Sequence, residues 1–579
     1  MIIGCSLIAL TTMFQVTSMP KETQDPRVRS YVTPVRVVAT SETGVSHAER
    51  LLGDKFGQVP DAPAGAPWGT DLQGVGSWMI LDFGRELHGG VQLGIGTSDA
   101  RGMKVRLRFG ESVSESCSDA DAPGGTASND HALRDMVVQV PLYGVLEVGN
   151  TGYRFLRIDL AEGEKVAFAF VRAVALMRPM AAIGAFRSSD ERLNRIFDTA
   201  VRTVHLCCQD YLWDGIKRDR LVWMGDTHPE TRTILPVFGA ASVLPDSLDY
   251  MAATTAPTGW MNNMPTYTLW WIRNLAEWYR FTGDVAYLRK HEEYLVRTFA
   301  HVREGMKGGE WLAGTFLDWP THDKPEAERA GTQGLALLTA RDTEMLAEAL
   351  GNAVLRFQAQ EMAETLERCA RRSHPADGKA DGPCAPLPKS AAAMLALSGL
   401  RTSREMFDTV LGRDGHAGVS TFYGYYMLEA MSAAGEQQRA LDTVRDYWGG
   451  MLDVGATSFW EDFDLAWTNN CFRIDELPVA GKKDIHGDYG NYCYKGFRHS
   501  LCHGWSAGPA AWCFRRVLGI EILEPGCKRL RIRPDLGDLE WAEGEMALPT
   551  GETIKVRACR KGPGAPEVEI TRPQWVAVE

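Results

Sequence analysis

Several features that define specialised protein classes are missing from this sequence of 579 residues. Its 12 cysteines include no C-x-x-C pair, so neither a disulfide scaffold nor a zinc or iron–sulfur site is expected. Beyond the first residues, no run approaches the ~20 apolar residues of a membrane-spanning helix. Positive charge is in deficit, with 62 Lys and Arg against 74 Asp and Glu, which opposes binding of nucleic acid. The composition is otherwise ordinary and predicts a globular protein with a neutral ligand.

The start of the chain is the only stretch that reads as a targeting signal. The first eighteen residues, MIIGCSLIALTTMFQVTS, are apolar and uncharged, and Val16-Thr17-Ser18 offers small residues where a signal peptide could be cleaved. No Lys or Arg precedes the apolar run, and Ile3-Gly4-Cys5 resembles the end of a lipoprotein box, so the signal is interpreted as truncated. We expect an exported protein, periplasmic or lipid-anchored. It would be cytoplasmic if this segment is not a signal.

Hydrophobic periodicity divides the chain into parts. Residues 1–34 are expected to be signal-like and flexible, and residues 35–185 alternate apolar and polar positions between glycine-rich breaks, which predicts an antiparallel β-sandwich. From 186 to 520 the period becomes helical, with about a dozen helices usable as six hairpins, which predicts an (α/α)6 barrel. Short alternating segments return over 521–579 and predict a small C-terminal β-domain.

The densest group of ionisable side chains is the string DGIKRDRLVWMGD at 214–226, between two predicted helices. Three carboxylates and three cations surround Trp223, which a solvated surface would not normally carry. Asp214, Asp219 and Asp226 could therefore converge on one small polar ligand and hold its hydroxyl groups.

A second acidic string, GATSFWEDF at 455–463, follows about 240 residues downstream. Glycoside hydrolysis requires two acids, one that protonates the leaving oxygen and one that activates water or attacks the anomeric carbon. Glu461, beside Trp460, is a candidate for the second acid. A surface acid at a helix start would give the same pattern.

A third string, from His486 to Gly508, contains G-x-S-x-G around Ser506. This pattern marks a hydrolase nucleophile only where an acid and then a histidine follow the serine, and no histidine follows His503. The sequence also lacks H-E-x-x-H and Walker A strings, so zinc peptidase and P-loop chemistry have no support. His503 is either a satisfied core residue or part of a pocket wall.

Together, DGIKRDRLVWMGD at 214–226, GATSFWEDF at 455–463 and RHSLCHGWSAGP at 498–509 resemble glycoside hydrolase family 78, the α-L-rhamnosidases of the six-hairpin glycosidase type. Flanking strings such as WMILDFGRELHGGVQL and LEPGCKRLRIRPDLGDLEW resemble the family's β domains. The resemblance implies an (α/α)6 barrel that hydrolyses a terminal α-L-rhamnose, or a closely related deoxysugar, with inversion at the anomeric carbon. It implies a rhamnose-containing oligosaccharide or glycoside as substrate and neither a metal nor an organic cofactor.

The resemblance also implies roles for individual residues. Asp219 falls at the position of the general acid and Glu461 at that of the water-activating base. The pocket positions implied by the resemblance are Asp214, Arg218, Trp223, Asp226, Asp318, Trp319, Trp460 and His503. One position departs from the family, which has Glu where this chain has Asp219. The missing methylene draws the carboxyl back by about 1.5 Å.

The cations beside Asp219 conflict with its implied role. A general acid must hold its proton near neutral pH, whereas cations that face a carboxyl favour its ionised form. We therefore expect Lys217, Arg218 and Arg220 to point away from Asp219 or to pair with other acids.

Two other functions stay open. A lyase or phosphorylase on the same barrel is the first, although a phosphorylase would need phosphate-binding groups where this chain has Glu461. The second is a catalytically weak carbohydrate-binding homologue, for which Asp219 in place of Glu is the only support.

Overall fold

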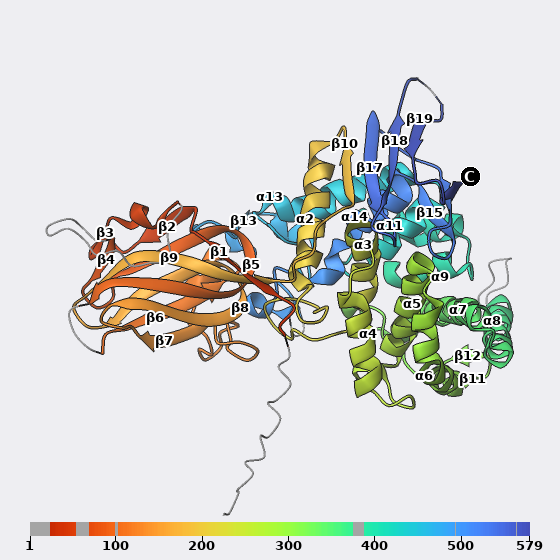
Figure 1. The fold of residues 1–579 in the computed structure, drawn as a ribbon, viewed down its shortest axis with the longest axis horizontal. Helices are drawn as coiled ribbons and strands as arrows, with labels where there is room; N and C mark the ends of the chain where they lie inside the picture. The colour runs from red at the N-terminus through yellow and green to blue at the C-terminus, as the bar shows by residue number, and fades with distance from the viewer. Residues whose placement is uncertain (1–23, 54–68, 99–101, 374–386, 492–493, 563) are drawn as a thin grey trace, which may run out of the picture.

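The computed structural model describes residues 24–53, 69–98, 102–373, 387–491, 494–562 and 564–579. Figure 1 shows a β domain at one end of an elongated molecule, a helical domain at the other end, and a smaller sheet packed against the helices. The predicted signal at residues 1–18 lies outside the described residues. Among the described helices, none has the length and apolar character needed to cross a lipid bilayer.

The β domain is an antiparallel sheet with the strand order β3-β4-β9-β5-β8-β6-β7, extended by β1 on β9 and by β2 on β5. Its strands curve around a hydrophobic core that includes Leu81, Leu93 and Ile158. The strands are β1 (Val28–Val32), β2 (Arg36–Thr40), β3 (Val45–Ser46), β4 (Thr70–Gln73), β5 (Trp78–Ser98), β6 (Lys104–Gly110), β7 (Asp135–Gln139), β8 (Gly144–Glu162) and β9 (Lys165–Met177), and helix α1 (Val113–Cys117) follows β6.

Two features of this domain differ from the sequence-based expectation. The glycine-rich breaks expected between short strands fall inside the long strands β5 and β8, where the register shifts between Asp82 and Leu87 and again between Gly89 and Val91. Strand β1 lies within residues 1–34, which were expected to be flexible. Its side chains are mostly exposed, so no alternation of apolar residues marks it, and backbone pairing with β9 holds it in the sheet.

The helical domain begins at α2, where the Asp190 carboxylate accepts hydrogen bonds from the backbone N–H groups of Arg192 and Leu193. The helices are α2 (Glu191–Cys207), α3 (Thr227–Phe238), α4 (Val243–Thr254), α5 (Pro265–Thr282), α6 (Val285–Glu304), α7 (Pro325–Leu350), α8 (Ala353–Ser373), α9 (Lys389–Ser398), α10 (Ser403–Met406), α11 (Gly424–Ala433), α12 (Gln437–Thr443), α13 (Gly449–Asp453) and α14 (Gly508–Trp512). Residues 499–503 form no helix and enter the site described below, and helical turns follow from Gly504 to Val517.

Helix packing follows the chain order. Helix α3 packs on α5, α5 on α7, α7 on α9, α9 on α11, α11 on α14, and α14 returns to α3. Short strand pairs, β11 (Met306–Lys307) with β12 (Glu310–Trp311) and β13 (Cys471–Phe472) with β14 (Lys483–Asp484), lie in the connecting segments. The connection with β13 and β14 carries the strings at 455–463 and 498–509, and the α2–α3 connection carries the string at 214–226.

The C-terminal strands form two small sheets against the helices. Strand β10 (Ala185–Ser188), which precedes α2, pairs with β17 (Trp541–Ala547), and β18 (Thr553–Cys559) and β19 (Glu567–Thr571) continue that sheet. Strands β15 (Ile520–Glu524), β16 (Arg529–Ile532) and β20 (Ala577–Val578) form the other. Figure 1 shows β10 beside β17 although more than 350 residues separate them in the chain.

Candidate active site

A cavity opens where connections from distant parts of the chain meet. Its walls come from the α2–α3 connection, the start of α5, the segment before α7 and the long connection between α13 and α14. The lining residues are Asp214, Arg218, Asp219, Trp223, Asp226, Met264, Tyr267, Trp319, Glu461, Tyr494, His503 and Trp505.

Backbone hydrogen bonds join the 214–226 connection to the segment before α14. The N–H of Gly504 donates to the carbonyl of Asp214 at 2.7 Å, and Gly215 pairs with His503 in an isolated bridge. A side chain at position 504 would overlap the carboxyl of the buried Glu230, so glycine at this position lets the two segments approach. The pairing sets Asp214 and His503 side by side.

Glu461 is buried and held at both carboxyl oxygens. Its Oε1 accepts a 2.6 Å hydrogen bond from Arg218 Nη2, and its Oε2 accepts a 3.1 Å hydrogen bond from the backbone N–H of Ser500. Because residues 499–503 form no helix, this N–H is available to the carboxylate. This fixes the orientation of Glu461 at the cavity.

The arginine next to Asp219 joins both candidate catalytic residues. Arg218 Nη1 donates to Asp219 Oδ1 at 3.2 Å while Nη2 contacts Glu461. The expectation that the three cations point away from Asp219 or pair with other acids therefore holds only in part for Arg218, which pairs with Glu461 but contacts Asp219 through the same guanidinium fork. It is correct for Lys217, which pairs with Glu115, and for Arg220, which donates to backbone carbonyls of the β domain.

His503 lies among three carboxyl groups. Its Nε2 is 3.5 Å from Asp214 Oδ2, 3.6 Å from Glu461 Oε1 and 3.9 Å from Asp226 Oδ1. Burial lowers the pKa of His503 to about 4, so the ring is neutral at neutral pH. Burial also raises the pKa of Asp214 and Asp226 well above the usual range, and repulsion from neighbouring carboxylates adds to it. These two side chains are called the cavity acids below, and burial favours the protonated form of each.

Aromatic rings form the remaining walls. Trp505 lies 4.1 Å from His503, and Arg218 lies over the Tyr494 ring at 5.1 Å. Tyr267 donates its hydroxyl to Asp226 Oδ2 at 3.0 Å and contacts Trp223 edge to face. Flat apolar faces beside fixed polar groups suit a sugar ring, which has both apolar C–H surface and hydroxyl groups.

Comparison with known proteins identifies the helical part. Residues 181–370 match the model of the bacterial alpha-L-rhamnosidase 6 hairpin glycosidase domain. Over these residues the helical domain is similar to that glycosidase domain. No curated protein sequence matches the chain.

Solved structures share the fold around this glycosidase domain. The GH78 family rhamnosidase of Bacillus sp. GL1 is 22% identical over 87% of this chain, with a TM-score of 0.69. The α-L-rhamnosidase from Dictyoglumus thermophilum is 15% identical over 96%, with a TM-score of 0.72, and the chain covers 59% of it. The rhamnosidase from Klebsiella oxytoca, solved with rhamnose bound, is 21% identical over 84% of this chain and 95% of its own, with a TM-score of 0.65. The chain spans about half of the Bacillus protein, 52%.

Most of the predicted site residues line the cavity of the glycosidase domain. The two that do not are Asp318 and Trp460. Asp318 accepts a hydrogen bond from Ser420, and Trp460 is fully buried and packs edge-on against Phe463. Sequence reasoning missed Met264, Tyr267, Tyr494 and Trp505. Trp505 lies inside the third string, close to His503, and suits a pocket wall, whereas Met264, directly before α5, and Tyr267, within α5, lie among apolar residues and carry no signal.

A second group of buried ionisable residues lies where the β domain meets the 214–226 connection. This interdomain cluster consists of Glu111, Glu115, Arg134, Lys217 and His486. Glu111, Glu115 and His486 place ligand-type atoms within 4.8 Å of one another, a spacing that a metal ion could use. The ammonium of Lys217 lies 2.8 Å from Glu115 and 3.3 Å from Glu111, so a protein cation already supplies positive charge there.

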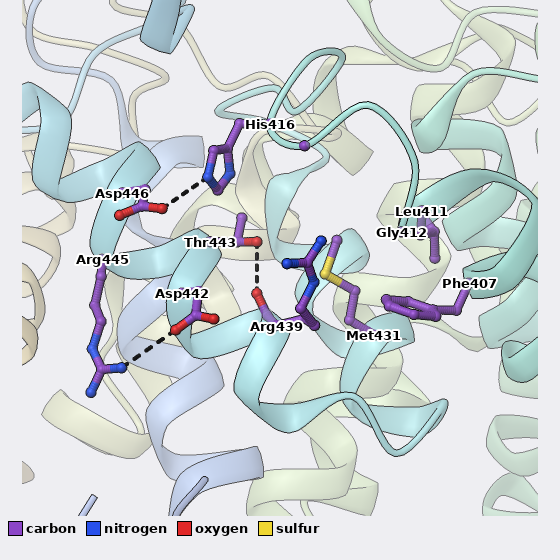
Figure 2. A pocket seen from close by; sticks show the side chains of 11 residues that line it. Phe407, Leu411, Gly412, His416, Met431, Arg439, Asp442, Thr443, Arg445 and Asp446 are labelled. Carbon is purple, nitrogen blue, oxygen red and sulfur yellow. Dashed lines mark hydrogen bonds and ion pairs between the residues drawn. The ribbon is translucent and has the colours of Figure 1, made fainter. Parts of the chain in front are cut away.

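Figure 2 shows a further hollow, formed by the end of α10 and the residues around α12, which shares no lining residue with the active-site cavity. Its charged residues pair with one another at the surface. His416 Nε2 lies 3.0 Å from Asp446, and Arg445 lies 3.5 Å from Asp442. His416 is therefore a partly exposed histidine outside the active-site cavity, and its substitution can serve as a control for changes at the cavity.

Proposed function

We propose that this chain is an inverting glycoside hydrolase that releases terminal α-L-rhamnose, or a closely related deoxysugar, from glycans or glycosides. The observation that carries the proposal is the Arg218 guanidinium, which brings the carboxyl groups of Asp219 and Glu461 to one cavity. The family match over 181–370 and the rhamnose bound in the Klebsiella oxytoca structure support the choice of sugar.

In this proposal Asp219 and Glu461 divide the proton transfers. Asp219 protonates the glycosidic oxygen as the bond to the anomeric carbon breaks. Glu461 takes a proton from the water that attacks the opposite face of the sugar, which requires roughly 6.5–9.5 Å between the two carboxyl groups. Arg218, on the fork between them, orients both groups and stabilises the charge that passes from one to the other.

The cavity acids are proposed to bind the sugar. Protonated Asp214 and Asp226 each offer one donor and one acceptor to hydroxyl groups, and neutral His503 between them offers another polar contact. Trp223, Trp319 and Trp505 face the apolar surface of the ring. These side chains perform the proposed hydrolysis without requiring a metal or an organic cofactor.

The finer architecture and the location are also proposals. We propose that the helices close into an (α/α)6 barrel, supported by the circuit of contacts from α3 through α5, α7, α9, α11 and α14 back to α3. The predicted domain limits at 35, 186 and 521 stay predictions. Export to the periplasm or a lipid anchor is supported by the apolar first eighteen residues alone. Fractionation of cells that express the full gene, with N-terminal sequencing of the product, tests this location.

A turnover experiment tests the function. The full chain is incubated with 4-nitrophenyl α-L-rhamnoside, and proton NMR follows the anomer that forms first. We expect β-L-rhamnose as the first product and a roughly thousandfold lower kcat in Glu461→Gln, with little change in sugar binding. Glu476→Gln, an exposed glutamate later in the same connection, is the control and should match the unmodified chain.

Each alternative predicts a different result in this experiment. First formation of the retained anomer contradicts the inverting mechanism. Release of rhamnose 1-phosphate only when phosphate is added identifies a phosphorylase, and an unsaturated sugar product identifies a lyase. Rhamnose binding without turnover identifies the carbohydrate-binding homologue, which the shorter Asp219 side chain favours.

A further inference from the structure

A histidine of the β domain contacts the turn that carries Asp219. His131 lies between α1 and β7 and reaches across the domain boundary. The backbone N–H of Asp219 donates to His131 Nδ1 at 3.1 Å. Arg220 Nη2 donates to the carbonyl of His131 at 2.6 Å, and its Nη1 donates to the carbonyl of Asn150 in β8 at 3.0 Å. The turn is thus fixed to the β domain by three hydrogen bonds.

The same turn has an unfavourable backbone conformation. Asp219 and Arg220 have φ angles of 51° and 55°, in the left-handed region that non-glycine residues rarely occupy. This conformation is strained for a residue with a Cβ atom, and it persists only where surrounding contacts enforce it. Contacts from the β domain meet both residues. We therefore infer that the β domain, through His131, enforces the conformation that aims Asp219 at the cavity.

The contact at Nδ1 also sets the position of the His131 proton. A backbone N–H always donates, so Nδ1 must accept and the neutral ring carries its proton on Nε2. This nitrogen lies 3.6 Å from Asp219 Oδ1 and 3.4 Å from Asp130 Oδ2. The ring thus contacts Asp219 twice, once at the backbone and once at the side chain.

The two donors near the Asp219 side chain converge on one oxygen. Arg218 Nη1, from the helical domain, and His131 Nε2, from the β domain, both approach Oδ1. Oδ2 is therefore the oxygen that remains to carry the proton to the leaving group. Other ionisable groups that face the imidazole are Asp130 and Arg498, which pair with each other at 2.6 Å, and the guanidinium of Arg498 lies 3.5 Å from His131 Nε2.

We propose that His131 is a positioning residue for the general acid, supplied by the β domain to a site otherwise built from the helical domain. This inference rests on the proposed hydrolase function. His131 does not contact the sugar in this proposal. It holds the Asp219 turn in its left-handed conformation and directs Oδ2 toward the glycosidic oxygen.

The test compares substrates that differ in their need for an acid. A 2,4-dinitrophenyl leaving group departs without protonation, whereas the leaving group of methyl α-L-rhamnoside must be protonated. In His131→Leu we expect kcat for the methyl rhamnoside to fall by about 10–100-fold, part of the 10²–10⁴-fold that a general acid contributes. For the dinitrophenyl rhamnoside, kcat should fall less than about threefold. KM should change little for either substrate.

His131→Asn and His416→Leu are the matched variants. Asparagine keeps an acceptor near the position of Nδ1, so it should recover much of the loss and also tests the inference if the leucine variant fails to fold. His416 pairs with Asp446 outside the site, and its loss should leave both substrates unchanged. An equal loss on both substrates, or no loss on the methyl rhamnoside, overturns the inference while the proposed function stands. Absence of turnover on every rhamnoside by the unmodified chain overturns both.

Discussion

Two groups of buried carboxyl side chains flank residues 499–504. They differ in how far neighbouring cations offset the effect of burial on their pKa values. In the interdomain cluster, burial alone would raise the pKa of Glu115, yet Arg134 and Lys217 bring it down to about 2, whereas burial outweighs Lys217 at Glu111 and raises its pKa to about 7. The cavity acids, Asp214 and Asp226, are as deeply buried, but Arg218 offsets only part of the burial of Asp214, and the pKa values of both acids are raised well above the ordinary range.

This contrast separates structural from functional burial of charge. Ion pairs of the interdomain cluster join the β domain to the 214–226 connection, and their hydrogen-bonding capacity is used within the protein. The cavity acids keep donors and acceptors that face the cavity, so a ligand with hydroxyl groups can complete them. Carboxyl groups with a raised pKa that line a hollow indicate a binding site more strongly than buried charge as such.

Removal of the cation from the interdomain cluster should have the largest effect. Lys217→Met leaves Glu111 without its nearest cation and Glu115 with Arg134 alone, and breaking a buried pair in this way costs about 3–5 kcal/mol. Urea denaturation should show this loss in the free energy of unfolding. Lys104→Met, which breaks an exposed pair with Glu162, is the control and should cost less than about 1 kcal/mol. A loss of similar size in both variants would contradict the contrast.

Substitution of a cavity acid should reverse the pattern. Asp214→Asn replaces a neutral acid by a neutral amide of the same shape, so the free energy of unfolding should not fall. In this variant an amide N–H takes the place of the acid proton that Asp214 donates to the sugar. We therefore expect kcat/KM on an aryl rhamnoside to fall about hundredfold, or about 2.7 kcal/mol. Asp408→Asn, at an exposed pair with Arg404, should change neither quantity. A large loss of stability in Asp214→Asn would place this residue with the structural group.

The pH dependence of stability distinguishes neutral from paired acids. Burial raises the pKa of Asp318 to about 7, against an ordinary value of 3.8, although Ser420 donates a hydrogen bond to it. Because the folded-state pKa is the higher one, its stabilising contribution is complete below about pH 4 and is lost as the pH rises to 7. Asp318→Asn removes this dependence. Between pH 5 and 7 the unmodified chain should lose about 2 kcal/mol of unfolding free energy more than the variant. Equal losses in urea titrations at the two pH values would disprove the shift.

The smallest expected effect concerns the support of a cavity acid. Tyr267→Phe removes the hydroxyl that donates to Asp226 Oδ2, worth about 0.5–1.5 kcal/mol, so KM for an aryl rhamnoside should rise up to about tenfold with kcat little changed. Tyr250→Phe, on an exposed ring, should leave KM as it was. A fall in kcat alone would assign Tyr267 a role in the chemical step.

The sequence predicts the broad order of β, helical and β parts because periodicity survives in long, regular elements. It does not predict the long strands β5 and β8, since bulges break the alternation within each of them.

Candidate site residues were found where acids and tryptophans concentrate in connections. The contacts among them were not predictable, because Arg218 and Glu461 are 243 positions apart and only the folded chain pairs them. His131 gave no signal at all. It stands in a polar loop of another domain, and nothing in its neighbours points to Asp219.

The pairing of β10 with β17 has a consequence for synthesis of the chain. Phe186 of β10 lies opposite Gly544 of β17, and the ribosome makes β17 about 350 residues after β10. The start of the helical domain therefore cannot complete this strand pairing until late in synthesis. The β domain, whose strands lie between Val28 and Met177, can fold as soon as it emerges. During that interval β10 presents an unpaired edge on a nascent chain. Ribosome-stalled chains that end before residue 541 should therefore bind chaperones at this edge, and chains extended past 547 should release them.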